Sequence, residues 1–342
     1  MPRDMTRLPI GKIPIPLLES TVLRLTGAKS DKVVSPAKAG VDFAAVKLRH
    51  GFMIVSADPI TGVSDRIGEF AVKVSANDVA TSGNLPAFAE PVVLLPEGST
   101  ANDLKKIAHQ IHASAKELGI TILGGHTEVT PGLRAPIVSV TVFCIADKFV
   151  TSADAKEGDS IMMTKTAGLE GTAELASEYE FPKGSVPEST LRRARQLIDL
   201  VGVTKEAVAG YRSGVVHAMH DCTEGGVLGA AYEMSLASGL GFVIDESSVP
   251  VAPETKRICD WLSIDPLRLI GSGSLLLAIE KGKEAKLKKA LQPICTATRI
   301  GEFTKGSKFL TRKDGSKLRL KDSPQDELWR VLGRAPGGRN RL

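Results

Sequence analysis

Aromatic residues are scarce in this 342-residue chain, in which Phe, Trp and Tyr together make up 4%. The core must therefore be built from aliphatic side chains, and the hydrophobic fraction of 42% is large enough for a sizeable one. The four cysteines form no CxxC pair, which suggests a reducing compartment and buried thiols. The net charge is only +5 and both signs are interleaved, so charge alone does not predict a nucleic-acid partner.

Long hydrophobic runs are also absent. No apolar stretch approaches the roughly 20 residues that span a bilayer, and Met1–Asp4 leads into no apolar segment of a signal peptide. The expectation is a soluble, cytoplasmic protein without a membrane partner. The sequence contains neither a Walker A motif nor a GxGxxG motif, so a nucleotide-binding site in this chain would have to use another fold.

The length suits two domains better than one. The first half mixes hairpin strands with long helices and the second alternates strands with helices, so the predicted fold class is α/β or α+β. The polar run 151–159 predicts the boundary. We therefore expect domains over 1–150 and 151–325, followed by a basic tail over 326–342 that is frayed at its end.

Hydrophobic periodicity and capping residues predict the individual elements. In the first half we expect helices over 12–25, 65–82 and 100–118, and strands over 44–48, 52–56, 88–95, 120–123 and 137–145. In the second half we expect strands over 160–164, 215–219 and 275–279, and helices over 169–177, 189–200, 284–291 and from 226 to Gly239.

The helix predicted over 65–82 carries the most informative polar residue. Its apolar stripe contains Phe70 and Val74, and helical spacing places Asp78 on the same stripe, one turn beyond Val74. A carboxylate that points into an apolar layer is costly unless something pairs with it. The alternative is a carboxylate at the helix end or a buried ion pair.

Two further aspartates stand at the ends of the predicted hairpin strands. Asp42 comes directly before the first strand and Asp58 follows the second. Each alone is more often a turn residue, but with Asp78 they offer the hard oxygen ligands that suit Mg²⁺ bound to nucleotide phosphates. No His or Cys spacing supports zinc.

Three segments offer backbone or side-chain groups to an anion. Gly124-Gly125-His126-Thr127-Glu128 follows a short strand, where an ordinary turn is the alternative. The segment 219–227 joins a strand to a helix and should leave bare N–H groups at the helix start, unless Thr223 caps it. Lys165 follows a strand and could meet a phosphate, although a solvated lysine is the more common case.

The order of these motifs resembles the aminoimidazole ribonucleotide synthetase-like (PurM-like) superfamily. The segments that carry the resemblance are Gly-Val-Asp-Phe-Ala-Ala-Val at 40–46, Ser-Ala-Asp at 56–58, Ser-Ala-Asn-Asp-Val-Ala-Thr-Ser-Gly at 75–83, Gly-Gly-His-Thr-Glu at 124–128 and His-Asp-Cys-Thr-Glu-Gly-Gly-Val at 220–227. Within that superfamily they are most similar to the HypE family of hydrogenase maturation proteins. Phe43 and Cys222 depart from the common pattern, which often has a second acid and a proline there.

The resemblance implies a two-domain PurM-like fold, with a dimerising N-terminal sheet and a C-terminal α/β domain. It also implies ATP and Mg²⁺ in the cleft between them, a homodimer and a possible maturation-protein partner. By position it assigns Asp42, Asp58 and Asp78 to the metal and Asp78, Glu128 and Asp221 to catalysis. The residues that it assigns to the nucleotide are Asn77, Gly124, Gly125, His126, Thr127, Lys165, Glu224, Gly225 and Gly226.

HypE proteins carry a carbamoyl group on a terminal cysteine and dehydrate it. This sequence ends in Gly338-Arg339-Asn340-Arg341-Leu342, so we expect that acceptor thiol to be missing. Three hypotheses remain: an ATP-dependent enzyme that activates a small or carbamoyl-type substrate, a phosphotransferase similar to thiamine-monophosphate kinase, and a non-catalytic nucleotide-binding dimer that acts as a maturation partner.

Overall fold

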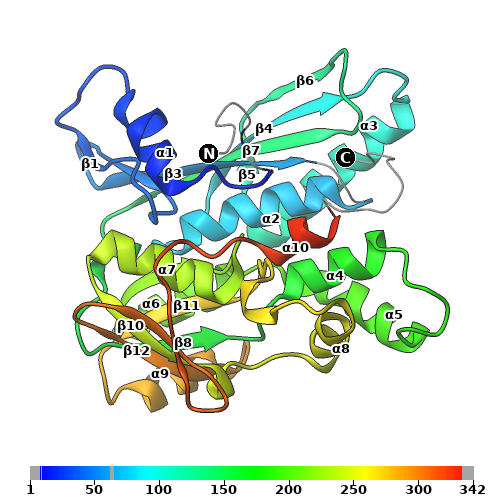
Figure 1. The fold of residues 1–342 in the computed structure, drawn as a ribbon. Coiled ribbons are helices and arrows are strands. Elements are labelled where there is room, and N and C mark those ends of the chain that lie inside the picture. The colour runs from blue at the N-terminus through cyan, green and yellow to red at the C-terminus, as the bar shows by residue number, and fades with distance from the viewer. Residues whose placement is uncertain (1–7, 9, 62–64, 333–342) are drawn as a thin grey trace, which may run out of the picture.

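The computed structural model describes residue 8, residues 10–61 and residues 65–332. Two sheets of seven strands each lie on either side of a central layer of helices, and α2 runs along the border between the two halves (Figure 1). The first sheet contains strands up to residue 146 and the second contains strands from residue 160 onwards. The chain therefore has the mixed α/β architecture that the sequence predicts.

The first sheet has the strand order β1-β2-β3-β7-β4-β5, with β6 also paired to β4. Neighbours are antiparallel except that β5 and β6 run parallel to β4. Its strands are β1 (Val33–Ser35), β2 (Ala44–Lys47), β3 (Phe52–Thr61), β4 (Phe88–Leu95), β5 (Thr121–Ile122), β6 (His126–Val129) and β7 (Ile137–Ala146).

One face of this sheet is covered by α2 (Ile67–Ala80) and α3 (Ala101–Leu118). Every second residue of β7 points into this layer, from Val138 to Ala146. Helix α3 is capped as predicted: Thr100 Oγ1 accepts from the Asp103 amide, and Gly119 ends the helix with φ of 73°. The short elements α1 (Ile15–Ser20) and η1 (Val22–Arg24) precede the sheet.

The second sheet has the order β14-β13-β10-β12-β8-β11-β9. Its strands are β8 (Ser160–Thr164), β9 (Val216–Asp221), β10 (Gly241–Asp245), β11 (Leu275–Ile279), β12 (Ala297–Thr304), β13 (Lys308–Thr311) and β14 (Lys317–Arg319). Strands β8 and β11 are buried along their whole length. One apolar layer joins this sheet to α7 (Gly226–Ser238), and another joins it to α6 (Thr204–Arg212) and α9 (Glu284–Leu291).

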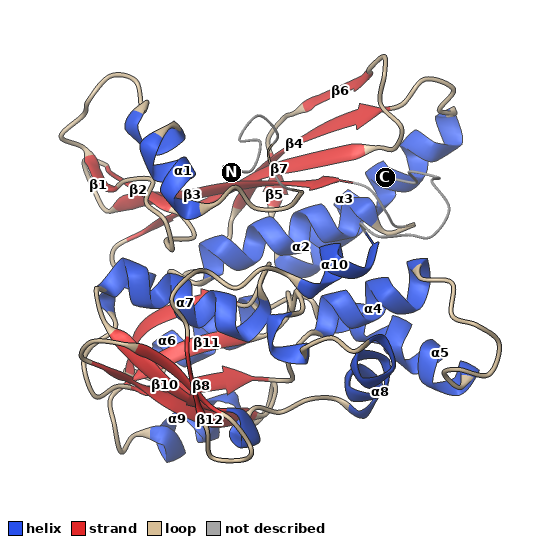
Figure 2. Cartoon of the chain, viewed as in Figure 1, coloured by secondary structure: helices blue, strands red, loops and turns tan. Residues whose placement is uncertain are grey.

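The remaining helices form their own apolar cluster beside the second sheet (Figure 2). They are α4 (Leu169–Glu178), α5 (Glu188–Gln196), α8 (Pro253–Leu262) and α10 (Glu327–Leu332), with short 3-10 helices over 152–154, 197–200, 246–248 and 266–268. None of the helices in the described part of the chain is long and apolar enough to cross a membrane.

Several sequence predictions need correction. The helix expected over 12–25 is split into α1 and η1, because Thr21 has φ of −117° and ψ of −86°. The loop expected at 124–128 is largely strand β6, since residues 126–129 pair with β4. Helices α6 and α8 and strands β1, β10, β13 and β14 were not predicted. The expected tail begins with the packed helix α10, whereas its frayed part, 333–342, lies outside the described residues.

Candidate functional site

Four aspartates from distant parts of the sequence converge where α2 and α7 face each other. Asp42 precedes β2, Asp58 lies on β3, Asp78 on α2 and Asp221 at the end of β9. Ser56 Oγ lies 2.7 Å from Asp78 Oδ2 and 3.0 Å from the Asp42 carbonyl oxygen, which ties β3 to both. The carboxyl groups of Asp58 and Asp78 share a hydrogen bond. The structure thus brings together the three predicted metal ligands.

Gly40 allows Asp42 to reach this position. Its φ is +79°, a left-handed conformation that side chains disfavour, and a Cβ there would lie 2.3 Å from the Glu233 carbonyl oxygen on α7. The backbone of residues 40–42 can therefore lie directly against α7. The Asp42 side chain, which is 5% exposed, then points to the end of β9.

Burial and mutual repulsion raise the pKa values of these acids. Burial, and then the negative charges of Asp58, Asp221 and Asp42, raise the pKa of Asp78 well above its usual range. Burial and the charge of Asp42 raise the pKa of Asp221 to about 7. Burial raises the pKa of Asp42 to about 6, although the neighbouring His220 opposes that shift. The cluster holds more negative charge than it can keep ionised, which a divalent cation would relieve.

The donor chemistry of the cluster fits Mg²⁺. Carboxylate oxygens are its preferred protein ligands, and Asp42 Oδ2 and Asp221 Oδ2 are buried without a hydrogen-bond partner among the described residues. Buried polar atoms of this kind are uncommon in folded proteins and call for an explanation. A cation bound between the carboxylates would satisfy both oxygens.

Sequence reasoning missed three residues that adjoin the aspartates: Lys12, His220 and Glu233. Lys12 Nζ lies 3.1 Å from Glu233 Oε1, and His220 Nε2 lies 3.1 Å from Glu233 Oε2. Burial lowers the pKa of His220, but the charges of Asp42 and Glu233 outweigh it and raise that pKa to about 9. Burial raises the pKa of Glu233, whereas Lys12 and His220 outweigh it and lower that pKa to about 2.

Two family models match consecutive parts of the sequence. Residues 40–146 match the N-terminal domain of AIR synthase related proteins, and residues 156–312 match the C-terminal domain. A carbamoyl dehydratase HypE from Cupriavidus necator is 30% identical over 249 residues, which cover 70% of this chain and 69% of that protein. The chain belongs to the AIR synthase related family.

Other proteins similar to this AIR synthase related chain have names that refer to hydrogenase formation or maturation. A protein of Methanocaldococcus jannaschii, provisionally named a hydrogenase expression/formation protein, is 32% identical over 225 residues, which cover 65% of each chain. The fold is similar to HypE in a HypE–HypF complex, with a TM-score of 0.73 and 22% identity over 90% of this chain and 99% of that chain. It is also similar to HypE in complex with ATP, with a TM-score of 0.70 and 21% identity over 83% and 89%.

The structure does not bring the segment 124–128 to the aspartates within one chain. Strand β6 lies three strands from β3, a separation of about 14 Å at the usual strand spacing. The segment is exposed, and His126 Nε2 pairs with Glu128 Oε2 at 3.0 Å. Packing alone explains why residue 125 is a glycine, because a Cβ there would lie 2.1 Å from the Pro91 carbonyl oxygen.

Asn77 and Lys165 are engaged by backbone groups of the loop 200–203. Asn77 Nδ2 donates to the Val201 carbonyl at 2.9 Å, and the Val203 amide donates to Asn77 Oδ1 at 2.8 Å. Lys165 Nζ donates to the carbonyl oxygens of Leu200, Gly202 and Gly273 and pairs with Glu206. The side chain of Lys165 is 14% exposed, so the alternative of a solvated lysine is wrong.

The start of α7 differs from the expected bare anion site. The Gly225 amide donates to Asp326 Oδ2 at 2.6 Å, and the Gly226 amide donates to the Thr223 carbonyl. Glu224 Oε1 accepts from the Lys12 amide and from Trp329 Nε1. The expectation of free amides at this helix start is therefore wrong, because a carboxylate of the chain's own C-terminal segment is already bound there.

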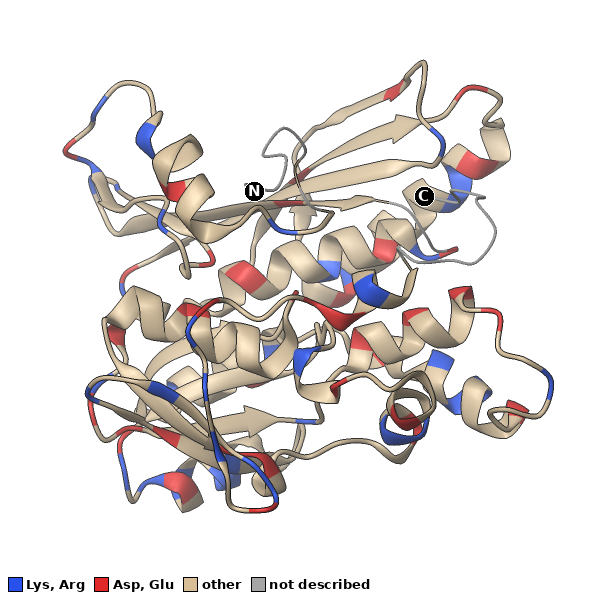
Figure 3. Ribbon diagram, in the orientation of Figure 1, with Lys and Arg blue, Asp and Glu red and all other residues tan. Residues whose placement is uncertain are grey.

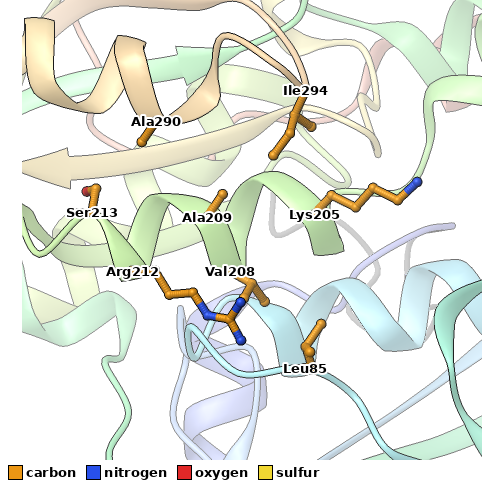
Figure 4. A pocket seen from close by; sticks show the side chains of 8 residues that line it. All are labelled: Leu85, Lys205, Val208, Ala209, Arg212, Ser213, Ala290 and Ile294. Atoms are coloured by element: carbon orange, nitrogen blue, oxygen red, sulfur yellow. The ribbon is translucent and has the colours of Figure 1, made fainter.

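A separate surface hollow of about 510 Å³ lies between α6, α9 and the segment before β4 (Figure 4). It is lined by Leu85, Lys205, Val208, Ala209, Arg212, Ser213, Ala290 and Ile294. None of the four aspartates lines this hollow. Two cationic side chains and several apolar ones line the hollow, so it is not part of the acidic site.

Proposed function

We propose that this protein binds Mg·ATP at Asp42, Asp58 and Asp78 and uses it to activate the oxygen of a small, carbamoyl-type substrate. The observation that carries the proposal is the convergence of Asp58 with three buried aspartates whose pKa values are raised, two of which have buried oxygens without a partner among the described residues. A relative at 30% identity is named a carbamoyl dehydratase, and a structure with the same fold contains ATP. Both support this assignment.

Mg²⁺ would neutralise the phosphate charges at this site, which is the largest electrostatic need of phosphoryl transfer. Asp42, Asp58 and Asp78 would hold the ion, and Ser56 would orient the Asp78 carboxyl. The substrate oxygen would attack the γ-phosphorus while the bond to ADP breaks, and phosphate would leave with that oxygen. The substrate nitrogen must lose two protons as the carbon–nitrogen triple bond forms. Asp221, whose pKa is raised to about 7 by burial and by Asp42, is suited to accept one, and the departing phosphate can take the other.

The residues of segment 124–128 that were predicted to bind the nucleotide belong to the proposal only if the protein forms a dimer. Residues 124–128 are about 14 Å from the acids of their own chain, so His126, Thr127 and Glu128 would act on a nucleotide only when a second copy of the chain presents them. We therefore propose a homodimer through the first sheet. Its open face carries the exposed side chains of Ile145 and Val92.

A maturation protein is the proposed heterologous partner. The basis is the similarity to HypE as found in its complex with HypF. Acidic and basic residues are interspersed over both halves of this chain in the view of Figure 3, with no stripe of one sign. Charges interspersed in this way favour a protein partner over a nucleic acid.

Calorimetric titration of ATP with and without Mg²⁺ tests the proposal. Wild-type protein should bind ATP only weakly without Mg²⁺, whereas Asp78→Asn should weaken Mg·ATP binding at least about tenfold. The fold should persist, because Asn keeps a partner for Ser56 and removes one charge from a repelling cluster. Mg·ATP should also raise the thermal midpoint of wild type and not of this variant.

Asp31→Asn is the matched control, since Asp31 is exposed in the same half of the chain. Unchanged Mg·ATP affinity in Asp78→Asn would count against the site. Turnover with carbamoyl compounds and with thiamine monophosphate then separates the proposed reaction from a kinase-like one. ATP binding without any turnover would favour the non-catalytic maturation partner.

A further inference from the structure

His220 lies in the acidic site, and the proposed Mg·ATP binding gives it no role. Its side chain is 4% exposed, and Nδ1 lies 2.8 Å from the carbonyl oxygen of Asp221. A carbonyl oxygen only accepts, so Nδ1 carries a proton and donates it. Nε2 is therefore the nitrogen that faces the site. An imidazole held in this way by a backbone carbonyl is the usual arrangement of a metal-ligating histidine.

Nε2 points between carboxylates without forming a well-directed hydrogen bond to either. Asp42 Oδ1 and Glu233 Oε2 each lie 3.1 Å from it. Nevertheless, within the described part of the chain, Nε2 has no hydrogen-bond partner of acceptable angle, and neither do Asp42 Oδ2 and Asp221 Oδ2. The three residues that hold these unpartnered atoms each have a ligand atom within 4.8 Å of the others, which indicates a shared ligand that all three can bind.

We propose that Asp42, His220 and Asp221 bind a divalent ion of the transition series, such as Zn²⁺ or Co²⁺, with Glu233 Oε2 as a fourth ligand. One ligand atom from each of the first three residues lies within 4.8 Å of the others. Ligands that sit about 2.0–2.2 Å from an ion lie up to roughly 4.4 Å apart, so small side-chain shifts close the site. This site shares Asp42 with the proposed Mg·ATP site and Asp221 with the proposed proton transfer, so Asp221 would accept a proton only while this metal is absent. Binding of the metal needs no nucleotide.

The donor set selects the class of metal. Mg²⁺ is bound almost wholly by oxygen, whereas an imidazole nitrogen among carboxylates suits the transition series and zinc. The charges also balance: three carboxylates are offset by the divalent ion and by the Lys12 ammonium, 3.1 Å from Glu233 Oε1. Without a metal, the Lys12 ammonium and a His220 imidazolium offset only two of the three carboxylates, which leaves one negative charge. Metal binding therefore has to be measured against that ion-pair arrangement.

Co²⁺ is a suitable probe because its absorption reports ligand type and geometry. After treatment of the full-length protein with a chelator, Co²⁺ is titrated without nucleotide, followed by Zn²⁺. The wild type should bind one Co²⁺ per chain more tightly than Mg²⁺, and Zn²⁺ should displace it. His220→Gln should weaken Co²⁺ affinity by more than about 100-fold, since loss of groups that merely support ligands already costs 10–100-fold.

Three variants make the result specific. His109→Gln should leave Co²⁺ binding unchanged, because His109 is an exposed residue of α3 that takes no part in either proposed site. Glu233→Gln should weaken it, because one of the proposed oxygens is lost. Asp58→Asn should weaken Mg·ATP binding but keep Co²⁺ binding, so failure of this metal site and failure of the nucleotide site give different results.

Equal Co²⁺ affinity in wild type and His220→Gln overturns the proposal, and so does wild-type Co²⁺ binding no tighter than that of Mg²⁺. Either result would assign His220 to a buried ion pair. If His220→Gln does not fold, pulsed electron paramagnetic resonance of Cu²⁺ bound to wild type decides the question. Coupling to an imidazole nitrogen supports the site, and coordination by oxygen alone overturns it.

Discussion

At the scale of single residues, the protein holds a second group of acids that no cation neutralises among the contacts described. Burial and the charges of Asp326 and Glu224 raise the pKa of Glu170 to about 7, although hydrogen bonds from Ser272 oppose the shift. Burial and the charges of Glu170 and Asp326 raise the pKa of Glu174 well above its usual range. Glu170 Oε2 has no hydrogen-bond partner. Ionisation of this group should therefore destabilise the folded state.

Glu170→Gln tests this through the pH dependence of stability. The folded pKa of about 7 lies above the usual value of 4.5, so protonation of Glu170 contributes stability that is full below pH 4.5 and lost as pH rises through 7. Gln mimics the protonated form at every pH. The variant should therefore gain stability relative to wild type between pH 5 and pH 8, by about 3 kcal/mol at most. Urea denaturation at both pH values measures this difference.

Glu180→Gln provides the comparison, because Glu180 is exposed and follows the same helix. It should shift stability equally at pH 5 and pH 8. A Glu170→Gln variant with the same pH dependence as wild type would show that Glu170 is already ionised without cost.

Helical spacing predicted correctly that Asp78 points inward. The same spacing also applies to Glu233, but the inward position of Glu233 was not predicted. Asp78 was found because it lies four residues after Val74 on an apolar stripe. Glu233 lies three residues after Ala230 and four before Ala237, both of which are buried, so its inward position was available from the same spacing. His220 carried no such signal. It was read as part of a loop, whereas β9 continues through Asp221.

At the scale of elements, prediction followed the strength of local signals. Strands β8 and β11 and helix α9 were predicted with their observed bounds, and α3 was predicted with its caps. Helix α6 was missed because Val203 offers no side-chain cap and the helix is short. Strand β6 was missed because four exposed residues become a strand only by pairing with β4, which is a non-local contact.

Gly40→Ala tests how the loop before β2 positions the site. The new Cβ would lie 2.3 Å from a backbone oxygen of α7 at a φ of +79°, so either the loop or the helix must move. We expect a loss of about 3 kcal/mol in unfolding free energy, together with weaker Mg·ATP binding as Asp42 is displaced. Urea denaturation and calorimetric titration measure the two effects.

The matched variant is Gly98→Ala, which has a φ of +86° but open space around the added Cβ. It should cost only about 1 kcal/mol from backbone strain and leave nucleotide binding unchanged. Equal losses in the two variants would mean that the close approach of Gly40 to α7 has no role.

At the scale of the whole molecule, the site depends on how the two halves are joined. Asn77 bonds the backbone of Val201 and Val203, while Phe70, Val74 and Val201 form a small apolar cluster across the same border. These contacts fix α2 against the second half and so hold Asp78 opposite Asp221. Sequence spacing gave the inward face of α2, but it could not supply the partner of Asn77, which lies more than 120 residues away.

The open face of the first sheet leads to the last prediction, which concerns assembly. Ile145 is 61% exposed and Val92 is 36% exposed, and both lie on the face opposite α2 and α3.

Light scattering of wild type at micromolar concentration should give a dimer. Ile145→Lys should weaken dimerisation by more than about 100-fold, because a charge would be buried without a partner. Leu318→Lys, at a 43% exposed site on the second sheet, should remain dimeric. If residues 124–128 act at the aspartates of a second copy, as proposed, the monomeric variant should also lose ATP turnover while keeping its folded spectrum. A monomeric wild type with full turnover would contradict both the assembly and the role given to Glu128.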